Sequence, residues 1–100
     1  MSGRFEYGAR FEILRTGLSD GVPTYQATIS WPEAHRATYN IEVPSEGELL
    51  MEAQEPKQGE PEAWMHAHLK SMLSTLVKGG RRAGKWPRRV NIWKESPAET

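Results

Sequence analysis

The sequence contains no cysteine, no apolar run of membrane-spanning length and no excess of positive or negative charge. The lack of cysteine excludes disulfide scaffolds, thiolate metal sites and cysteine nucleophiles, and it is typical of a reducing compartment. A transmembrane helix needs roughly 18 apolar residues, which no stretch approaches. The first residues lack the apolar run of a secretory signal peptide. We therefore expect a soluble, cytoplasmic protein without a membrane partner.

The charged residues balance at 13 of each sign, but they are unevenly distributed along the chain. Between Glu42 and Glu62 there are seven glutamates and a single basic residue, Lys57. Residues 78–89 carry six basic residues and no acidic one. Such a dipolar chain has two charged surfaces that suit partners of opposite sign, although a neutral domain must also place its charges somewhere.

Apolar and polar residues alternate with period two through most of the first half of the chain. Because successive side chains of a strand point to opposite faces, this pattern predicts half-buried strands. The predicted strands are residues 4–15, 24–31, 38–43 and, less regularly, 48–53. Glycine, proline and polar residues predict loops at 16–23 and 32–37 and a tight turn at 44–47.

The second half contains one predicted amphipathic helix, from about Pro61 to the paired glycines Gly79 and Gly80. Proline suits the first turn because its missing N–H would be unpaired there, and glycine is typical of a helix C-terminus. The apolar residues of the helix recur at spacings of three and four and form one stripe: Met65, Leu69, Met72, Leu73 and Leu76. Residues 86–94 then predict a last strand, and residues 95–100 predict a flexible tail.

These elements predict a single α+β domain over residues 1–94, with the order β-β-β-β-α-β. Short turns favour a four-stranded antiparallel meander, and the helix would pack on its apolar face, with the C-terminal strand as a fifth. The expected core consists of Phe11, Ile13, Ile29, Ile41, Leu69, Leu73 and Leu76. The opposite sheet face would be polar and open to solvent.

No motif in the sequence identifies a catalytic, cofactor or metal site. The glycines of Gly79-x-x-x-x-Gly84-Lys85 match part of a phosphate-binding loop, but such a loop follows a strand and opens a helix, and the predicted order here is reversed. His66 and His68 are two residues apart on a helix, so they project roughly 200° apart and cannot share a metal. We expect neither an enzyme nor a bound cofactor.

The strongest functional signal is the basic stretch between the predicted helix and the last strand. Its cations could neutralise phosphates, and Trp86 and Trp93 would stack on bases if they are exposed. The candidate contacts for nucleic acid or another anionic partner are Lys78, Arg81, Arg82, Lys85, Trp86, Arg88 and Arg89. This pattern predicts a small non-catalytic binding module for single-stranded nucleic acid or a phosphate backbone.

Other interpretations of the same residues stay open. A protein–protein interaction or adaptor module would use the acidic 42–62 region or the basic stretch, without nucleic acid. The arginines would alternatively protect an edge strand from aggregation. If Trp86 and Trp93 are not exposed, they would instead fill the core. We expect Trp31 and Trp64 to be buried in the core. The oligomeric state does not follow from the sequence.

Overall fold

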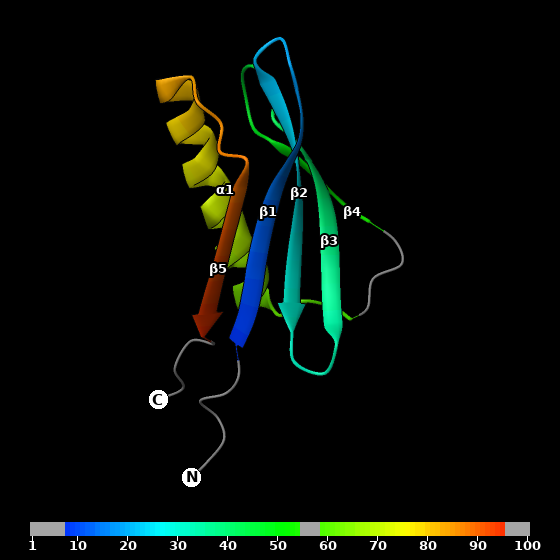
Figure 1. The fold of residues 1–100 in the computed structure, drawn as a ribbon. Helices are drawn as coiled ribbons and strands as arrows, with labels where there is room; N and C mark the ends of the chain where they lie inside the picture. Colours follow the sequence, from blue (N-terminus) through cyan, green and yellow to red (C-terminus); the bar gives the residue numbers. More distant parts are fainter. Residues whose placement is uncertain (1–7, 55–58, 96–100) are drawn as a thin grey trace.

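Three long strands joined by short turns form the centre of the sheet in the computed structural model, which describes residues 8–54 and 59–95 (Figure 1). These strands are β1 (Gly8–Ser19), β2 (Val22–Trp31) and β3 (His35–Glu42). The loop predicted at residues 16–23 is wrong, because only Asp20 and Gly21 lie between β1 and β2. Both residues have positive φ, 54° and 76°, which suits a two-residue hairpin turn and lets the strands pair up to it.

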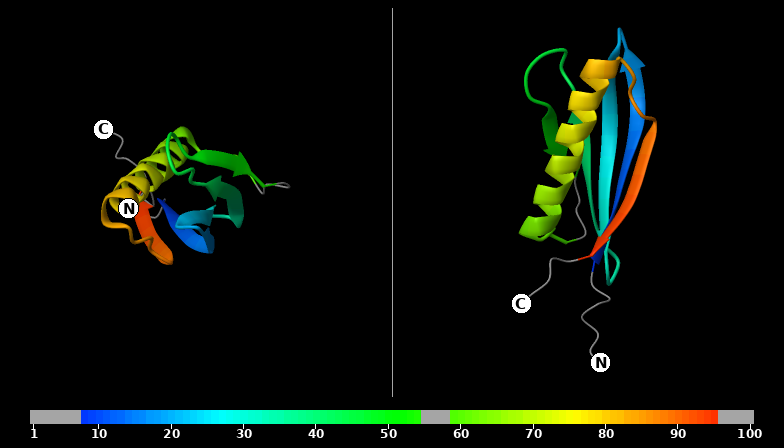
Figure 2. Two further views of the ribbon diagram at one scale, coloured as in Figure 1. Left: turned by 90° about the horizontal axis from the view of Figure 1, so that it is seen from above. Right: turned by 90° about the vertical axis from the view of Figure 1, so that its left-hand side faces the viewer.

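The two edge strands come from opposite ends of the remaining sequence. Strand β4 (Leu50–Ala53) pairs with β3, and β5 (Arg89–Glu95) pairs with β1, so the antiparallel sheet has the order β4-β3-β2-β1-β5. The helix α1 (Ala63–Ala83) connects the two edges and lies on the concave side of the sheet (Figure 2). The predicted α+β class and the element order β-β-β-β-α-β are confirmed.

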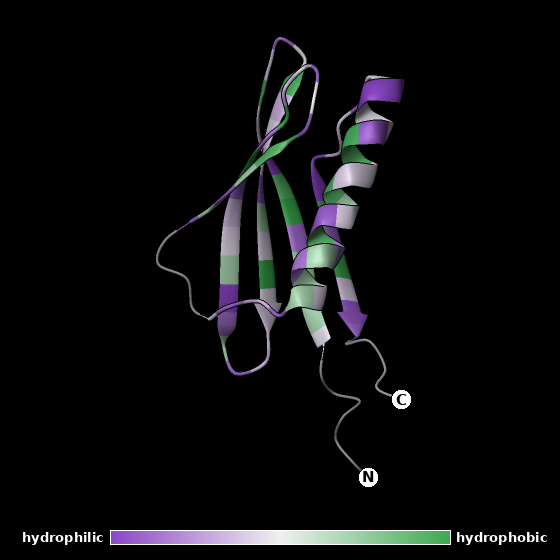
Figure 3. Cartoon of the chain, turned by 180° about the vertical axis from the view of Figure 1, so that it is seen from behind, coloured by the Kyte–Doolittle hydropathy of each residue, from purple (hydrophilic) through white to green (hydrophobic). Residues whose placement is uncertain are grey.

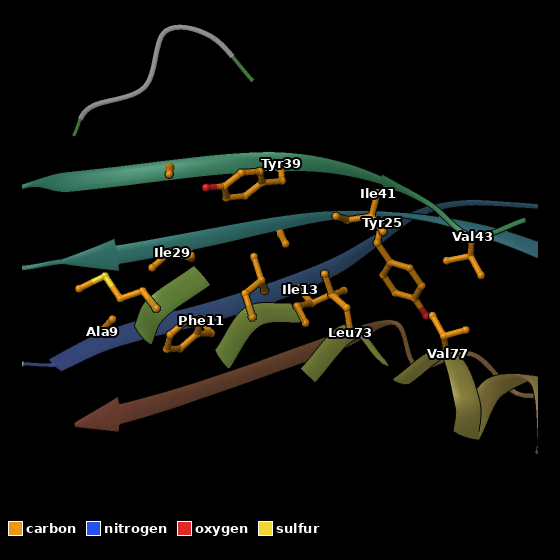
Figure 4. Close-up of a cluster of buried hydrophobic side chains, with 14 residues drawn as sticks. Ala9, Phe11, Ile13, Tyr25, Ile29, Tyr39, Ile41, Val43, Leu73 and Val77 are labelled. Atoms are coloured by element: carbon orange, nitrogen blue, oxygen red, sulfur yellow. The ribbon is translucent and has the colours of Figure 1, made fainter. Parts of the chain in front are cut away.

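The core lies between α1 and the apolar face of the sheet, as the alternation predicts (Figure 4). Phe11, Ile13, Ile29, Leu69 and Leu73 are completely buried, and Ile41 is nearly so. Leu76 is only partly buried, because the inward stripe of the helix runs through Met65, Leu69, Leu73, Val77 and Gly80. Trp31 and Trp64, which we expected to be buried, are partly buried at the margin of this core.

The helix ends one turn later than its glycines predict. Helical residues continue through Arg81, Arg82 and Ala83, and Gly84 ends the helix in the left-handed conformation (φ 72°), where its N–H donates to the carbonyl of Gly80. Gly80 has a different role, because a Cβ built there would overlap the indole ring of Trp86. It is therefore a packing glycine, and Gly84 is the C-terminal glycine of the helix.

The other sheet face is open and polar in the part of the chain that the structure describes. Partner residues across neighbouring strands share a face, so the register places Arg10, Glu12, Gln26, Thr28, Ser30, Thr38 and Asn40 on it. The start of the predicted strand 4–15 lies outside the described residues, as does the predicted tail 95–100 apart from Glu95, which is the last residue of β5. Within residues 8–54 and 59–95, no helix is both long enough and apolar enough to span a membrane.

Candidate nucleic-acid interface

The basic stretch 78–89 is divided among three structural elements. Residues 78–83 form the last turns of α1, residues 84–88 connect the helix to the sheet, and Arg89 begins β5. The last turn of the helix is accordingly hydrophilic (Figure 3). The basic residues are thus divided among the end of a helix, a connection and the start of a strand, rather than presented on one loop. As the sequence indicates, Gly84 and Lys85 follow a helix, so they cannot act as a phosphate-binding loop.

The connection 84–88 is held against the ends of β1 and β2 by three hydrogen bonds. The hydroxyl of Tyr25 donates to the carbonyl of Pro87 at 2.7 Å. The side chain and the main-chain N–H of Arg15 donate to the carbonyls of Trp86 and Arg88, at 2.8 and 2.9 Å. The indole of Trp86 packs against Gly80 and the edge of the core. Trp86 is therefore partly buried by this packing, and its role as a partner contact stays a prediction.

Two of the candidate arginines already have partners within the chain. One amino group of Arg81, Nη2, donates to the carbonyls of Pro44 and Gly47 at 2.7 and 2.8 Å. Arg89 forms an ion pair with Glu12 across the β1–β5 pair, with 3.0 Å between Nη2 and Oε2. Arg81 thus ties the end of α1 to the β3–β4 connection, whereas Arg89 remains largely exposed beside its partner.

The four other cations of the stretch are exposed. The side chains of Lys78, Arg82, Lys85 and Arg88 form no hydrogen bond or ion pair with any residue in the ranges 8–54 and 59–95. An anion can approach them without breaking a contact within that part of the chain. They lie at the end of the molecule where α1 ends and β5 begins (Figure 1).

Trp93 is half exposed (50%) and lies on the open face of the sheet, unlike Trp86. It faces Arg10 on β1, which faces Ser30 on β2, which in turn faces Arg36 on β3. We call these four residues the Trp93 row. At the usual strand spacing the row extends over roughly 14 Å. It places an aromatic ring and two guanidinium groups on one surface.

The position of the Trp93 ring depends on Gly8 of the neighbouring strand. A Cβ built on Gly8 would lie 2.5 Å from Cζ2 of Trp93, so the indole covers a position where only glycine fits. Gly8 is buried beneath the ring. The indole therefore rests on the backbone of β1 and leaves half of its surface to solvent, as a stacking platform requires.

The cations of the Trp93 row are missing from the sequence-based contacts. Arg10 follows the alternation of β1 and is expected on the polar face, but nothing in the sequence pairs it with Trp93. Arg36 falls in a predicted connection, whereas β3 begins at His35 and includes it. The side chain of neither arginine has a hydrogen bond or ion pair among the residues that the structure describes. Only the strand register shows that they belong to one surface.

Two grooves flank α1 on the other side of the sheet. The β4 groove has a volume of about 1010 Å³ and lies between the helix and the β3–β4 edge, where Tyr39, Leu49, Met51 and Val77 meet Glu48, Lys70, Lys78 and Arg81. The β5 groove has a volume of about 410 Å³ and is lined by Met72, Leu76, Val90, Ile92 and neighbouring residues of both elements. The first groove is mixed in charge, and the second is mostly apolar.

Two titratable side chains have pKa values displaced by burial. Burial raises the pKa of Tyr25 above its usual 10.0, although the nearby Arg15 charge acts in the opposite direction. Burial and, secondarily, the charge of Lys94 lower the pKa of His68 below its usual 6.5. The His68 ring packs edge-on against Phe11 with 4.8 Å between centroids, and its Nε2 is enclosed without a described partner. Both residues therefore act in packing.

The described residues contain no group of three or more histidine or acidic side chains that could hold a metal ion. His66 packs edge-on against Tyr39 and His68 against Phe11, so the two imidazoles contact different strands. Comparisons of the chain with known protein families, curated proteins and solved structures gave no match.

Proposed function

We propose that this protein is a non-catalytic module that binds single-stranded nucleic acid on the open face of its sheet. The observation that carries the proposal is the exposed indole of Trp93 in one cross-strand row with Arg10 and Arg36. An exposed aromatic ring stacks on any base, and flanking arginines neutralise phosphates. This combination suits a flexible single strand, whose bases are free to stack on the ring.

The basic stretch supports the proposal from the other end of β5. Arg89 lies on the same face as Trp93, four residues away, or roughly 13 Å along the strand. Arg82, Lys85 and Arg88 are exposed just beyond it. A nucleic-acid strand that stacks on Trp93 and follows β5 would therefore reach these cations one after another. Each cation could neutralise one of its phosphates.

The acidic residues of the open face define where the bound strand would run. Glu42 and Glu52 lie toward the β3–β4 edge, in cross-strand rows other than that of Trp93, and Glu95 lies at the end of β5, on the side of Trp93 away from Arg89. Glu12 is neutralised by Arg89. We infer that the nucleic acid follows β5 and the Trp93 row and avoids the β4 edge, because its phosphates are repelled there. We propose the cytoplasm as its compartment, which the lack of cysteine supports.

The decisive experiment is a titration of the protein with single- and double-stranded oligonucleotides at low and moderate salt. We expect binding to the single strand that weakens steeply as salt rises. Trp93→Ala should weaken binding by roughly 1–3 kcal/mol with little change in salt slope, because stacking is not a charge contact. Arg36→Ala should weaken binding and flatten the log–log salt slope by roughly 0.7.

Lys70→Ala is the matched control, since Lys70 is an exposed cation on α1 in the β4 groove, away from the open face. It removes the same charge as Arg36→Ala and should leave oligonucleotide affinity nearly unchanged. If the wild type does not bind at low salt, or if Lys70→Ala weakens binding as much as Arg36→Ala does, the proposal fails.

The β4 groove favours a second candidate function, which is binding of a protein partner. Its apolar floor is next to β4, an edge strand, and acidic residues of the 42–62 region such as Glu48 lie at its rim. Such a partner would add an extended segment beside β4 and place a basic side chain near the acids. Partner binding that is unaffected by Trp93→Ala, in the absence of oligonucleotide binding at low salt, would favour this function.

A further inference from the structure

Strand β5 is an edge of the sheet with unpaired backbone groups. It pairs with β1 on one side, and no strand among residues 8–54 and 59–95 pairs with its other side (Figure 1). Its side chains are mostly exposed, including Ile92 at 40% and Trp93 at 50%. Such an edge is a template for pairing with another strand unless it is blocked.

The hydrogen bonds of β1 show which groups of β5 face outward. The N–H of Arg15 donates to the carbonyl of Arg88, and the same register continues to Leu14 opposite Arg89. In an antiparallel ladder, alternate residues direct their backbone groups to one neighbouring strand and the remaining residues to the other. The outward N–H and carbonyl groups therefore belong to Arg89, Asn91, Trp93 and Glu95.

These outward groups allow β5 to pair with a second copy of itself. In an antiparallel ladder, residues with outward groups must lie opposite one another. A two-fold axis at Ile92 meets this condition over the whole strand, because it places Asn91 opposite Trp93 and Arg89 opposite Glu95. A shift of two residues would also preserve the hydrogen-bonding pattern, but it would shorten the ladder.

The charges of β5 select the register centred on Ile92. At one end of the strand Arg89 is exposed, and at the other end Glu95 is exposed. The two-fold axis brings the arginine of each copy opposite the glutamate of the other, so two opposite-charge pairs form on the open face. Cross-strand pairs of opposite charge stabilise an antiparallel ladder, and a register shift would lose both.

The apolar β5 groove lies beside this edge on the helix side. Val90 and Ile92 line it together with Met72 and Leu76 of α1. In the paired arrangement Ile92 of each copy lies opposite Ile92 of the other, next to both grooves, and the alkyl part of Lys94 covers Val90 of the other copy. Pairing would therefore bury apolar side chains that the single chain leaves exposed.

From these observations we propose that the protein forms a symmetric homodimer in which two copies of β5 pair antiparallel about Ile92 and join the two sheets. A two-fold interface of this kind is closed, so it pairs the exposed edges of both copies and leaves neither edge free to add further copies into a fibre. The proposal does not depend on what the open face binds.

The oligomeric state at several protein concentrations, measured by sedimentation, tests the proposal directly. We expect the wild type to have twice the mass of the chain. Glu95→Arg should dissociate the dimer through two arginine–arginine contacts. The double variant R89E/E95R should restore it, since each pair is then reversed in sign. Glu46→Arg makes the same charge change in the β3–β4 connection and should leave the dimer intact.

Asn91→Pro tests the backbone pairing separately. The N–H that proline lacks points away from β1 at this position, so the pairing of β5 with β1 is retained while the outward ladder is interrupted. We expect a folded monomer. If this variant does not fold, the charge-reversal series alone decides. A wild type that remains a monomer at high concentration, or a dimer that survives Glu95→Arg, overturns the proposal.

Discussion

Neighbouring glycines of α1 have opposite environments, and each predicts a different response to substitution. A Cβ at Gly79 meets nothing within 4 Å, whereas a Cβ at Gly80 collides with Trp86. Alanine is favoured over glycine in a helix, so Gly79→Ala should stabilise the fold by about 0.5–1 kcal/mol. Gly80→Ala should instead destabilise it by roughly 1–3 kcal/mol, because the indole must move.

Urea denaturation of the two glycine variants compares them directly. The helix propensity gained is the same at both positions, so the difference between them isolates the contact with Trp86. If Gly80→Ala were as stable as Gly79→Ala, the indole would not lie against the helix. Trp86 would then again be available as a stacking residue.

His68 predicts a pH dependence of stability. Its pKa is lowered in the folded state by burial and by Lys94, so the unfolded chain binds the proton more readily. The stability contributed by neutral His68 is therefore complete above its usual pKa of 6.5 and is lost as the pH falls through the lower folded value.

Denaturation midpoints between neutral pH and about pH 5 test this effect, above the range where most carboxylates titrate. His68→Gln should remove part of the decrease in stability with falling pH. Lys94→Gln should reduce the decrease less, because burial is the larger cause. A His68→Gln variant with the same pH dependence as the wild type would contradict the assignment.

At the scale of the element, Arg81 and Arg82 at the end of α1 should differ in how much they stabilise the fold. Only Arg81 contacts the β3–β4 connection. Arg81 donates to the carbonyls of Pro44 and Gly47, whereas the side chain of Arg82 is exposed and forms no hydrogen bond or ion pair with the described residues. Arg81→Ala should therefore lower the free energy of unfolding by about 1 kcal/mol, since charged hydrogen bonds are lost at an exposed site. Arg82→Ala should change it by no more than about 0.5 kcal/mol.

Urea denaturation and oligonucleotide titration of both arginine variants distinguish an effect on stability from an effect on binding. Arg82→Ala should weaken the binding of oligonucleotides while leaving the free energy of unfolding nearly unchanged. The opposite order of stabilities would mean that the helix end is not tied to the β3–β4 connection. The sequence interpretation treated the two arginines as equivalent phosphate contacts, but only Arg82 is a clean probe of that role.

At the scale of the whole molecule, a single layer of side chains joins the helix to the sheet. Leu73 is completely buried in this layer, and Leu76 lies partly buried at its margin. Leu73→Ala should destabilise the protein by roughly 2–5 kcal/mol through lost burial and a cavity. Leu76→Ala should cost roughly 1 kcal/mol, because less apolar surface is buried.

Chemical denaturation of these two leucine variants checks the phase of the helix. Equal losses, or a larger loss at position 76, would mean that the helix is rotated relative to the sheet. Leu76 also lines the β5 groove, so its variant should be measured at a concentration where the oligomeric state is known.

Local patterns in the sequence determined the class of the fold and most of its core. The alternation around Phe11, Ile29 and Ile41 and the helical spacing of Leu69 and Leu73 reflect side-chain directions within one element, so they can be read without knowing its neighbours. The basic character of residues 78–89 is likewise visible in the chain itself.

Tertiary structure decided which residues share a surface. Strand register placed Arg10 and Arg36 in one row with Trp93, an arrangement that no local spacing encodes. Trp86 packs on Gly80, which therefore lies inside the helix, and the helix ends at Gly84 instead. Local side-chain directions follow from backbone geometry, but the surface for a partner depends on long-range pairing between segments far apart in the sequence.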